Sequence, residues 1–312
     1  MFIDKLIEAI KTKNNPTVAG LDPKIEYVPS FIINKCFNEF GKTLEACGEA
    51  IFEFNKGLID ALYDIVPVIK PQLAYYEMYG IEGMKAFYNT CAYAKEKGLL
   101  IIADGKRNDI GSTSEAYSKA FIGQTEIADG ITQTAFGADA LTVNPYLGED
   151  GINPFIDDCK NNGNGIFVLV KTSNKSSGQL QDLLIKTDKG EKHIYEAVAE
   201  LVDQWGEGVK GKYGYSSVGA VVGATYPEQA KVLRQIMKNA YILVPGYGAQ
   251  GGTANTAAVN FNKDGLGAIV NASRSIMCAY KSEKWKDKFN EQTYAEAARA
   301  EALNMREELN KR

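Results

Sequence analysis

The feature that most restricts how this chain can fold is a series of eight short aliphatic segments, separated mostly by stretches with helical character. Each segment is almost continuously apolar, as expected for parallel strands that are buried on both faces. The segments cover residues 17–20, 66–70, 99–103, 140–144, 166–170, 218–222, 241–244 and 268–270. Because strands that alternate with helices form parallel sheets, the pattern predicts an α/β protein.

Helices are expected between most of these strands, most clearly at residues 81–97, 114–129, 193–205 and 227–238. Eight repeats favour a closed barrel over an open doubly wound sheet, which usually has fewer strands and often a glycine-rich first turn. Here the first turn reads Leu21-Asp22-Pro23. We therefore expect one (β/α)8 TIM barrel domain over residues 1–312, with an extra N-terminal helix and loop insertions.

Composition restricts the compartment and the partners. The net charge of −4 argues against binding to nucleic acid, although a local basic pocket for one phosphate is allowed. Five cysteines without CxxC spacing indicate neither a disulfide framework nor a zinc site, so a reducing cytoplasm is expected. No apolar run is long enough to cross a bilayer, and residues 1–11 form an amphipathic pattern with acids, unlike a signal peptide.

Charged residues gather at the end of the third predicted strand. Asp104 and Lys106 can point the same way because alternate side chains of a strand share a face, Asp109 follows in the next turn, and Lys70 ends the second strand. Interleaved opposite charges keep each other ionised. A structural ion-pair network would also explain them, but their position at strand ends favours a reactive site.

This cluster suits a decarboxylation. A substrate carboxylate held beside Asp104 would add an uncompensated negative charge, and loss of carbon dioxide would remove it. A protonated lysine could then stabilise and protonate the carbanion, and Lys106 is the best-placed candidate.

A second group of residues predicts a phosphate site. The loop at 244–253 is rich in glycine and lies after the seventh strand, and Arg274 follows the eighth. Loops at these two positions commonly bind phosphate in barrels, through exposed backbone N–H groups, a helix N-terminus and a bidentate guanidinium.

These two groups, in this order and spacing, resemble the orotidine 5'-phosphate decarboxylase family, and in particular its longer bacterial type 2 subgroup. The third-strand pattern of the family is Asp-x-Lys-x-x-Asp with a following Ile and a nearby Thr, found here as Asp104, Lys106, Asp109, Ile110 and Thr113. The resemblance continues through the sequences at 70–72, 171–174, 177–182, 222–225 and 245–252. It therefore covers essentially the whole chain.

The resemblance implies the conversion of orotidine 5'-phosphate to uridine 5'-phosphate, the last step of de novo UMP biosynthesis, with no metal or organic cofactor. Lys106 would protonate C6 within the charge network of Lys70, Asp104 and Asp109. Asp109 and Thr113 would reach into the neighbouring subunit's site, which implies a homodimer. The candidate substrate-binding residues are Asp22, at the ribose together with Lys70, Thr113, Asn144, Ser173 at the pyrimidine edge, Pro245, Gln250 between base and phosphate, Gly251, Ser273, and Arg274 at the phosphate.

Small departures from the family pattern remove no reacting group: Gly105 replaces a larger residue and Asn108 stands where glycine is frequent. Residues 182–193 form a polar excursion without an assigned role, which we expect to be a solvated loop. His193, the only histidine, lies there, away from every strand end, so a catalytic role is not expected.

Two other functions are considered. A magnesium-dependent sugar-phosphate decarboxylase or aldolase of the same superfamily can share the Asp-x-Lys-x-x-Asp strand, but an acid then occupies the second-strand position, where Lys70 would repel the metal. The second is a noncatalytic nucleotide-binding barrel that has lost the chemistry. All the proposed reacting groups are present, which argues against it.

Overall fold

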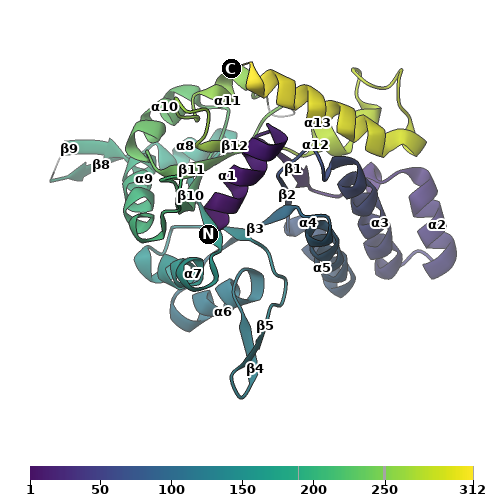
Figure 1. Cartoon of the computed structure of the whole chain (residues 1–312), viewed down its shortest axis with the longest axis horizontal. Coiled ribbons are helices and arrows are strands. Elements are labelled where there is room, and N and C mark those ends of the chain that lie inside the picture. Colours follow the sequence, from purple (N-terminus) through teal and green to yellow (C-terminus); the bar gives the residue numbers. More distant parts are fainter. Residues whose placement is uncertain (189, 249–250, 312) are drawn as a thin grey trace. The chain divides into compact units, whose positions relative to one another are not determined.

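The computed structural model describes residues 1–188, 190–248 and 251–311. Within these ranges eight parallel strands pair in the order β1, β12, β11, β10, β7, β6, β3, β2 and back to β1, which closes the barrel. The strands are β1 (Thr17–Leu21), β2 (Val68–Pro71), β3 (Leu100–Arg107), β6 (Ala140–Val143), β7 (Gly165–Lys171), β10 (Ser216–Val222), β11 (Ala240–Val244) and β12 (Ala268–Ala272). The fold is a (β/α)8 barrel, and all eight predicted strands are confirmed (Figure 1).

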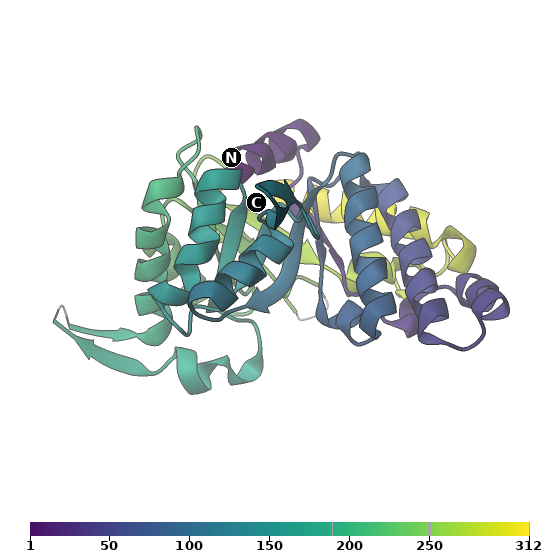
Figure 2. The same cartoon turned by 90° about the horizontal axis from the view of Figure 1, so that it is seen from below.

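The helices of the described chain alternate with these strands (Figures 1 and 2). They are α1 (Phe2–Lys13), α2 (Ser30–Phe40), α3 (Leu44–Leu62), α4 (Ala74–Glu77), α5 (Gly80–Glu96), α6 (Gly111–Phe121), α7 (Glu149–Asn162), α8 (Gly178–Gln181), α9 (Ile194–Trp205), α10 (Pro227–Ile236), α11 (Ala254–Ala258), α12 (Arg274–Met277) and α13 (Tyr294–Asn310). Single 3-10 turns are η1 (Ile25–Tyr27), η2 (Lys175–Ser177), η3 (Glu207–Val209), η4 (Ala279–Lys281) and η5 (Glu291–Thr293). In the described part of the chain, no helix has the length and apolar character needed to cross a membrane.

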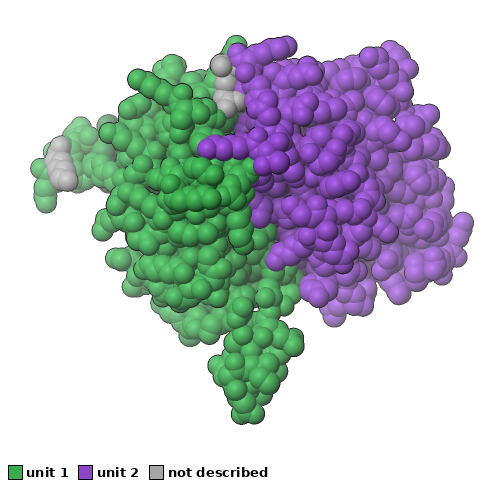
Figure 3. Space-filling model, viewed as in Figure 1, with its two compact units in different colours: residues 1–8, 106–270, 312 green, residues 9–105, 271–311 purple. Residues whose placement is uncertain are grey.

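The chain forms two compact units, which are coloured separately in Figure 3. Unit 1 contains Met1–Glu8 and Lys106–Val270, and unit 2 contains Ala9–Gly105 and Asn271–Lys311. Their boundaries fall inside α1, β3 and β12. One domain over residues 1–312 stays a prediction.

Unit 2 contains the paired strands β1, β2 and β3, with Val18 opposite Val68 and Val68 opposite Leu100. All residues of β1 and β2 are buried, as their continuous apolar character predicts. Helices α2, α3 and α5 lie side by side in this unit (Figures 1 and 2). The side chain of Thr43 accepts a hydrogen bond from the backbone of Ala46 and so caps the start of α3.

Unit 1 contains the neighbouring strands β6, β7, β10 and β11, and the β11 register continues to Ala268–Val270 of β12. The expected N-terminal helix is present as α1, and its first residue, Phe2, packs edge-on against Phe167 with ring centroids 6.1 Å apart. Gly165 makes room for this ring, because a Cβ there would lie 2.3 Å from Phe2. The start of the chain is thereby packed against β7.

The expected helix over 114–129 is wrong in its second half. Helix α6 ends at Phe121, and the chain continues as an antiparallel hairpin of β4 (Thr125–Ala128) and β5 (Ile131–Gln133) that projects from unit 1 (Figure 1). Asp129 and Gly130, between the strands, both have positive φ. An Asp-Gly pair is a strong sequence signal for such a two-residue turn, and it outweighed the local helical pattern.

The polar excursion after the fifth strand is also not a loop. Its residues form a second antiparallel hairpin, β8 (Leu184–Thr187) and β9 (Gly190–His193), with Leu184 opposite His193. The hairpin leads directly into α9, and the Glu196 carboxylate accepts the backbone N–H of His193 at 2.6 Å. The expectation of solvation holds only for the side chains, most of which are exposed.

Candidate active site

In unit 2 the structure brings together three of the candidate residues, Lys70, Asp104 and Asp22. The Nζ of Lys70 lies 2.7 Å from Oδ2 of Asp104 and 3.8 Å from Oδ1 of Asp22. Lys70 is 3% exposed and Asp104 8% exposed, so their ion pair is largely shielded from water. These side chains come from the C-terminal ends of β1, β2 and β3, where parallel strands place them side by side.

The charge state of Lys70 follows from competing effects. Burial lowers the pKa of its ammonium group, but the charges of Asp104 and Asp22 raise it by more, so the pKa lies above its ordinary value. Lys70 therefore stays protonated at neutral pH. A buried cation between two carboxylates holds both anions near the strand ends, and the predicted network of Lys70, Asp104, Lys106 and Asp109 stays a prediction.

Gln72 is a member of this cluster that the sequence analysis did not single out. Its Nε2 donates to the same Asp104 oxygen at 2.9 Å, and its backbone N–H donates to Leu21 O at 3.0 Å. Asp104 Oδ2 thus accepts two side-chain donors, from Lys70 and from Gln72. The spacing of the sequence could have indicated Gln72, because it lies two residues after Lys70 and residues two apart on one strand share a face.

The end of β12 supplies Ser273 and Arg274 to unit 2. Ser273 approaches β1 because Gly20 has no side chain: a Cβ there would lie 2.1 Å from Ser273 Oγ. Asn271 Nδ2 donates to this hydroxyl at 3.2 Å. Arg274, the first residue of α12, is exposed, and the structure gives its guanidinium no hydrogen bond or ion pair with any described residue. None of the described residues engages these donors, which suit a ligand anion.

In unit 1, Lys106 lies at the end of β3 in an unusual conformation. Its φ is +48°, a region that L residues other than glycine, asparagine and aspartate seldom adopt. Its side chain is exposed, and its backbone N–H donates to Thr142 Oγ1 at 3.0 Å. The expectation that strand alternation directs Lys106 assumed an extended backbone, and it does not apply at this residue. Non-glycine residues held at positive φ are enriched at functional sites.

Asp109 and Thr113 lie where unit 1 continues from β3 into α6. Asp109 Oδ1 accepts the backbone N–H of Ile110 at 2.8 Å, directly before the helix, and Asp109 is only partly buried. Thr113 is exposed in the first turn of α6. Both side chains are therefore accessible on this unit, and neither belongs to the unit that contains the Lys70 cluster.

Asn144 and Ser173 follow β6 and β7. The Oδ1 of Asn144 accepts the backbone N–H of Tyr146 at 3.0 Å, so the side chain also shapes its own turn. Its backbone N–H donates to Arg107 O at 3.1 Å. Ser173 is half-buried, and its hydroxyl has no hydrogen bond to another described residue.

The glycine-rich loop after β11 folds onto itself. Gly252 N–H donates to Gly246 O at 3.0 Å and Gly248 N–H donates to Gly252 O at 2.8 Å. Gly251 has a φ of +89° and is exposed, whereas Pro245 accepts the N–H of Ala224 at 2.9 Å. Gln250, the predicted link between base and phosphate, lies outside the described residues.

Helix α11 begins at Ala254, and its start is already capped. Thr253 Oγ1 accepts the N–H of Thr256, and Thr256 Oγ1 accepts the N–H of Thr253. Two of the N–H groups that a phosphate could have used are satisfied inside the chain.

A buried ionisable cluster at the C-terminal ends of barrel strands marks a candidate reaction site. Fold and strand ends together place the chain among the (β/α)8-barrel enzymes. In the described residues, no group of three or more His, Cys, Asp and Glu side chains is arranged to hold a metal ion.

Comparison with known proteins gives the particular family. The family described as "Orotidine 5'-phosphate decarboxylase / HUMPS family" matches residues 51–287. The chain is 44% identical to the orotidine 5'-phosphate decarboxylase of Caldicellulosiruptor saccharolyticus over 293 residues, 94% of each chain. It is 41% identical to the enzyme of that name from Clostridium acetobutylicum over 311 residues, 100% of this chain and 99% of the other. The structure of Leishmania donovani OMP decarboxylase superposes with a TM-score of 0.69 at 28% identity, covering 98% of both chains. The chain belongs to the orotidine 5'-phosphate decarboxylase / HUMPS family.

Proposed function

We propose that this chain decarboxylates orotidine 5'-phosphate to uridine 5'-phosphate, the last step of de novo pyrimidine biosynthesis, in the cytoplasm and without a cofactor. The observation that carries the proposal is the buried contact of Lys70 with Asp104 and Asp22 at the ends of three adjacent strands. The relatives named orotidine 5'-phosphate decarboxylase support it, since they match over nearly the whole chain.

In the proposed reaction the bond between C6 and the carboxylate carbon breaks and carbon dioxide leaves. The electron pair stays on C6, and the ammonium group of Lys106 gives its proton to that carbon. The fixed negative charge of Asp104 disfavours the substrate carboxylate and not the product, because the charge of the carboxylate departs with carbon dioxide. Lys70 and Gln72 hold the carboxylate of Asp104 in place for this effect.

The remaining candidate residues are proposed to bind different parts of the substrate. Asp22 and Lys70 would hold the ribose hydroxyls, and Ser173 the pyrimidine edge. Arg274 would bind the phosphate, for which its exposed guanidinium is suited. Asn144, Pro245, Gln250, Gly251 and Ser273 would complete the binding surface.

Asp109 and Thr113 are proposed to act in the site of a second subunit. Both side chains are accessible on unit 1, at the junction of β3 and α6. The proposed active form is a homodimer whose two sites each use residues from both subunits.

The position of Lys70 argues against the magnesium-dependent alternative, which the family description leaves open because it also includes HUMPS. In such enzymes an acid stands at this strand position. Here an ammonium group occupies it and forms ion pairs with Asp104 and Asp22. A noncatalytic barrel is disfavoured because Lys70, Asp104, Lys106 and Asp109 are all present.

The deciding experiment follows the absorbance of orotidine 5'-phosphate with purified protein in excess chelator. We expect full turnover. Activity that is lost with chelator and restored by magnesium would favour the metal-dependent alternative. Binding of uridine 5'-phosphate without any turnover would favour the noncatalytic barrel.

A further inference from the structure

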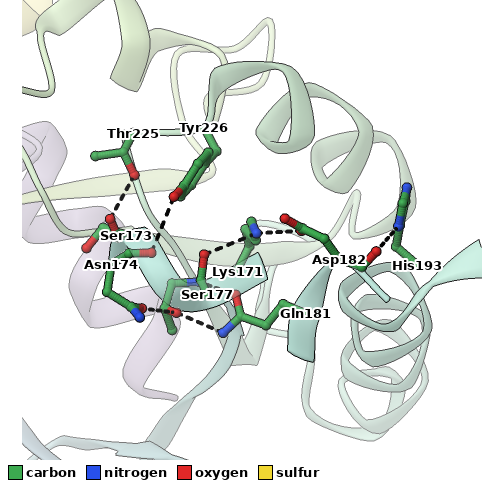
Figure 4. A network of polar contacts seen from close by, with 10 residues as sticks. Lys171, Ser173, Asn174, Ser177, Gln181, Asp182, His193, Thr225 and Tyr226 are labelled. Carbon is green, nitrogen blue, oxygen red and sulfur yellow. Dashed lines mark hydrogen bonds and ion pairs between the residues drawn. The ribbon is translucent and has the colours of Figure 1, made fainter. Parts of the chain in front are cut away.

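The segment between β7 and α9 in unit 1 carries a polar network that the proposed reaction leaves unexplained. It begins at Lys171, the last residue of β7, passes through Ser173, η2 and α8, and reaches Asp182 before the β8–β9 hairpin. Figure 4 shows that its side chains converge around the strand end. All of these residues belong to unit 1.

The centre of the network is a buried ion pair. The side chain of Lys171 is 0% exposed, and its Nζ lies 2.6 Å from Asp182 Oδ1 and 3.2 Å from Ser177 Oγ. The ammonium group also lies 4.6 Å from the ring centroid of Tyr226 and 5.6 Å from that of Tyr195. A fully buried lysine depends on such partners, so Asp182 is held to the strand end across eleven positions of sequence.

Gln181 forms two hydrogen bonds with Thr172, the residue before Ser173. Its Oε1 accepts the backbone N–H of Thr172 at 3.0 Å, and its Nε2 donates to Thr172 Oγ1 at 2.8 Å. The Thr172 hydroxyl donates in turn to Asn174 Oδ1 at 2.6 Å. One amide group thus fixes both the backbone and the side chain of Thr172.

The other side of Ser173 is fastened by the segment after β10. Thr225 Oγ1 donates to Ser173 O at 3.2 Å, and Tyr226 Oη donates to Asn174 O at 3.3 Å (Figure 4). Gly223 allows this close approach, because a Cβ there would lie 2.7 Å from the Cβ of Ser173. The backbone of Ser173 is therefore held from both directions while its hydroxyl has no bond to another described residue.

A fixed backbone with a hydroxyl that no described residue engages is the arrangement expected of a side chain held ready for a ligand. We propose that Lys171, Gln181 and Asp182 form a clamp that positions Ser173 for the pyrimidine edge of the substrate. These three are positioning residues that act through Ser173 and do not touch the substrate. The proposal rests on the proposed function, which assigns the base contact to Ser173.

The polar excursion at residues 182–193 is connected to the clamp by hydrogen bonds at both ends of its hairpin. The peptide carbonyl of Asp182 lies 2.8 Å from His193 Nδ1, and Leu183 O accepts the backbone N–H of Ile194 at 3.0 Å. The ends of the β8–β9 hairpin are thus tied to the residues that follow Gln181. These contacts hold the end of the clamp segment against the start of α9.

The main test is Gln181→Met, which removes both hydrogen bonds to Thr172 and keeps the length of the side chain. The matched control is Gln179→Met on the same short helix, because Gln179 is exposed and makes no hydrogen bond to a described residue. Asp182→Asn is the second variant. It discharges the partner of a buried lysine and is expected to lower the melting temperature as well, so Gln181→Met carries the test if Asp182→Asn fails to fold.

The measurements are kcat, KM and inhibition by uridine 5'-phosphate and by ribose 5-phosphate, which lacks the base. We expect Gln181→Met to lower kcat/KM and to weaken inhibition by uridine 5'-phosphate about three- to tenfold, the range for one net hydrogen bond. Inhibition by ribose 5-phosphate should be unchanged, as should every value for Gln179→Met. An effect confined to the melting temperature would overturn the clamp in favour of a purely structural network.

A double-mutant cycle with Ser173→Ala separates the proposals. If Gln181 acts through Ser173, Gln181→Met should have almost no further effect in the Ser173→Ala background. Additive losses, or a Ser173→Ala variant that is impaired while Gln181→Met is normal, would overturn the clamp alone. A wild-type protein without turnover would overturn the proposed function, and the clamp with it.

Discussion

The Nζ of Lys70 lies 2.7 Å from Oδ2 of Asp104, and the same carboxylate oxygen accepts Nε2 of Gln72 at 2.9 Å. Two donors from one strand end therefore hold a nearly buried anion. A carboxylate held in this way cannot turn away from a negatively charged ligand, as an exposed one could. This relationship is the basis of the first prediction.

The Lys70 cluster predicts how stability changes with pH. The pKa of Lys70 is raised in the folded protein, so its contribution to stability is complete below the unfolded value of about 10.4 and is lost as pH rises through the raised folded pKa. Urea unfolding at several pH values above neutrality should show the advantage of wild type over Lys70→Met shrinking above about pH 10. An advantage that grew over this range would contradict the assigned charge balance.

Lys106→Ala should abolish measurable turnover while the protein stays folded. The side chain is exposed, so its loss removes little packing, whereas loss of a general acid typically costs about 10²–10⁴-fold in rate. Turnover and thermal unfolding should be measured together, with Lys42→Ala, an exposed lysine in the turn before α3, as the control. Near-normal turnover by Lys106→Ala would show that another group supplies the proton.

Arg274→Ala should mainly raise KM, by roughly ten- to hundredfold, with a smaller change in kcat. The guanidinium is exposed and has no described partner, so its loss should leave stability unchanged. Arg306→Ala in α13 is the control variant. A fall in kcat at constant KM would instead place Arg274 in the chemical step.

Gly252→Ala should disrupt the loop after β11. An added Cβ would lie 2.6 Å from Gly246 O and 2.8 Å from the Cβ of Ala224, where neither neighbour is the end of a flexible side chain. We expect KM to rise roughly tenfold or more because the loop can no longer close on itself. Gly208→Ala, whose Cβ would make an ordinary 3.5 Å contact with Lys160, serves as the comparison. Equal KM values for the two variants would exclude a role for the loop conformation in binding.

Mixing two inactive variants should restore activity if sites are shared between subunits. In a heterodimer of Asp109→Ala and Lys70→Ala chains, one site carries both changes and the other carries neither. Random exchange should recover about a quarter of wild-type activity. Subunit exchange must be verified independently, for example with differently tagged chains. Exchange without recovery would count against shared sites.

The barrel itself could be predicted from the sequence because each strand is a local, nearly continuous apolar run. All eight predicted runs became strands, and β1, β2 and β10 are fully buried. Two local predictions were wrong for identifiable reasons. Helix α6 ends at Phe121 and is followed by the hairpin around Asp129 and Gly130. In the excursion at 182–193, the residues of β8 and β9 pair with each other as antiparallel strands.

The candidate residues of the site were also visible in the sequence, because barrel strands place their chemistry at their C-terminal ends. The residues that these candidates contact could not be predicted from the sequence. The contacts of Lys70 with Asp104 and Asp22, of Gln72 with Asp104 and of Lys171 with Asp182 join side chains 11 to 48 positions apart. Such pairs depend on which strand ends and loops the fold brings together, and on the burial that strengthens their attraction. Sequence alone therefore determined the strands and the candidate residues at their ends, whereas the tertiary structure decided which charges meet, the left-handed backbone at Lys106 and the contacts that hold the backbone around Ser173.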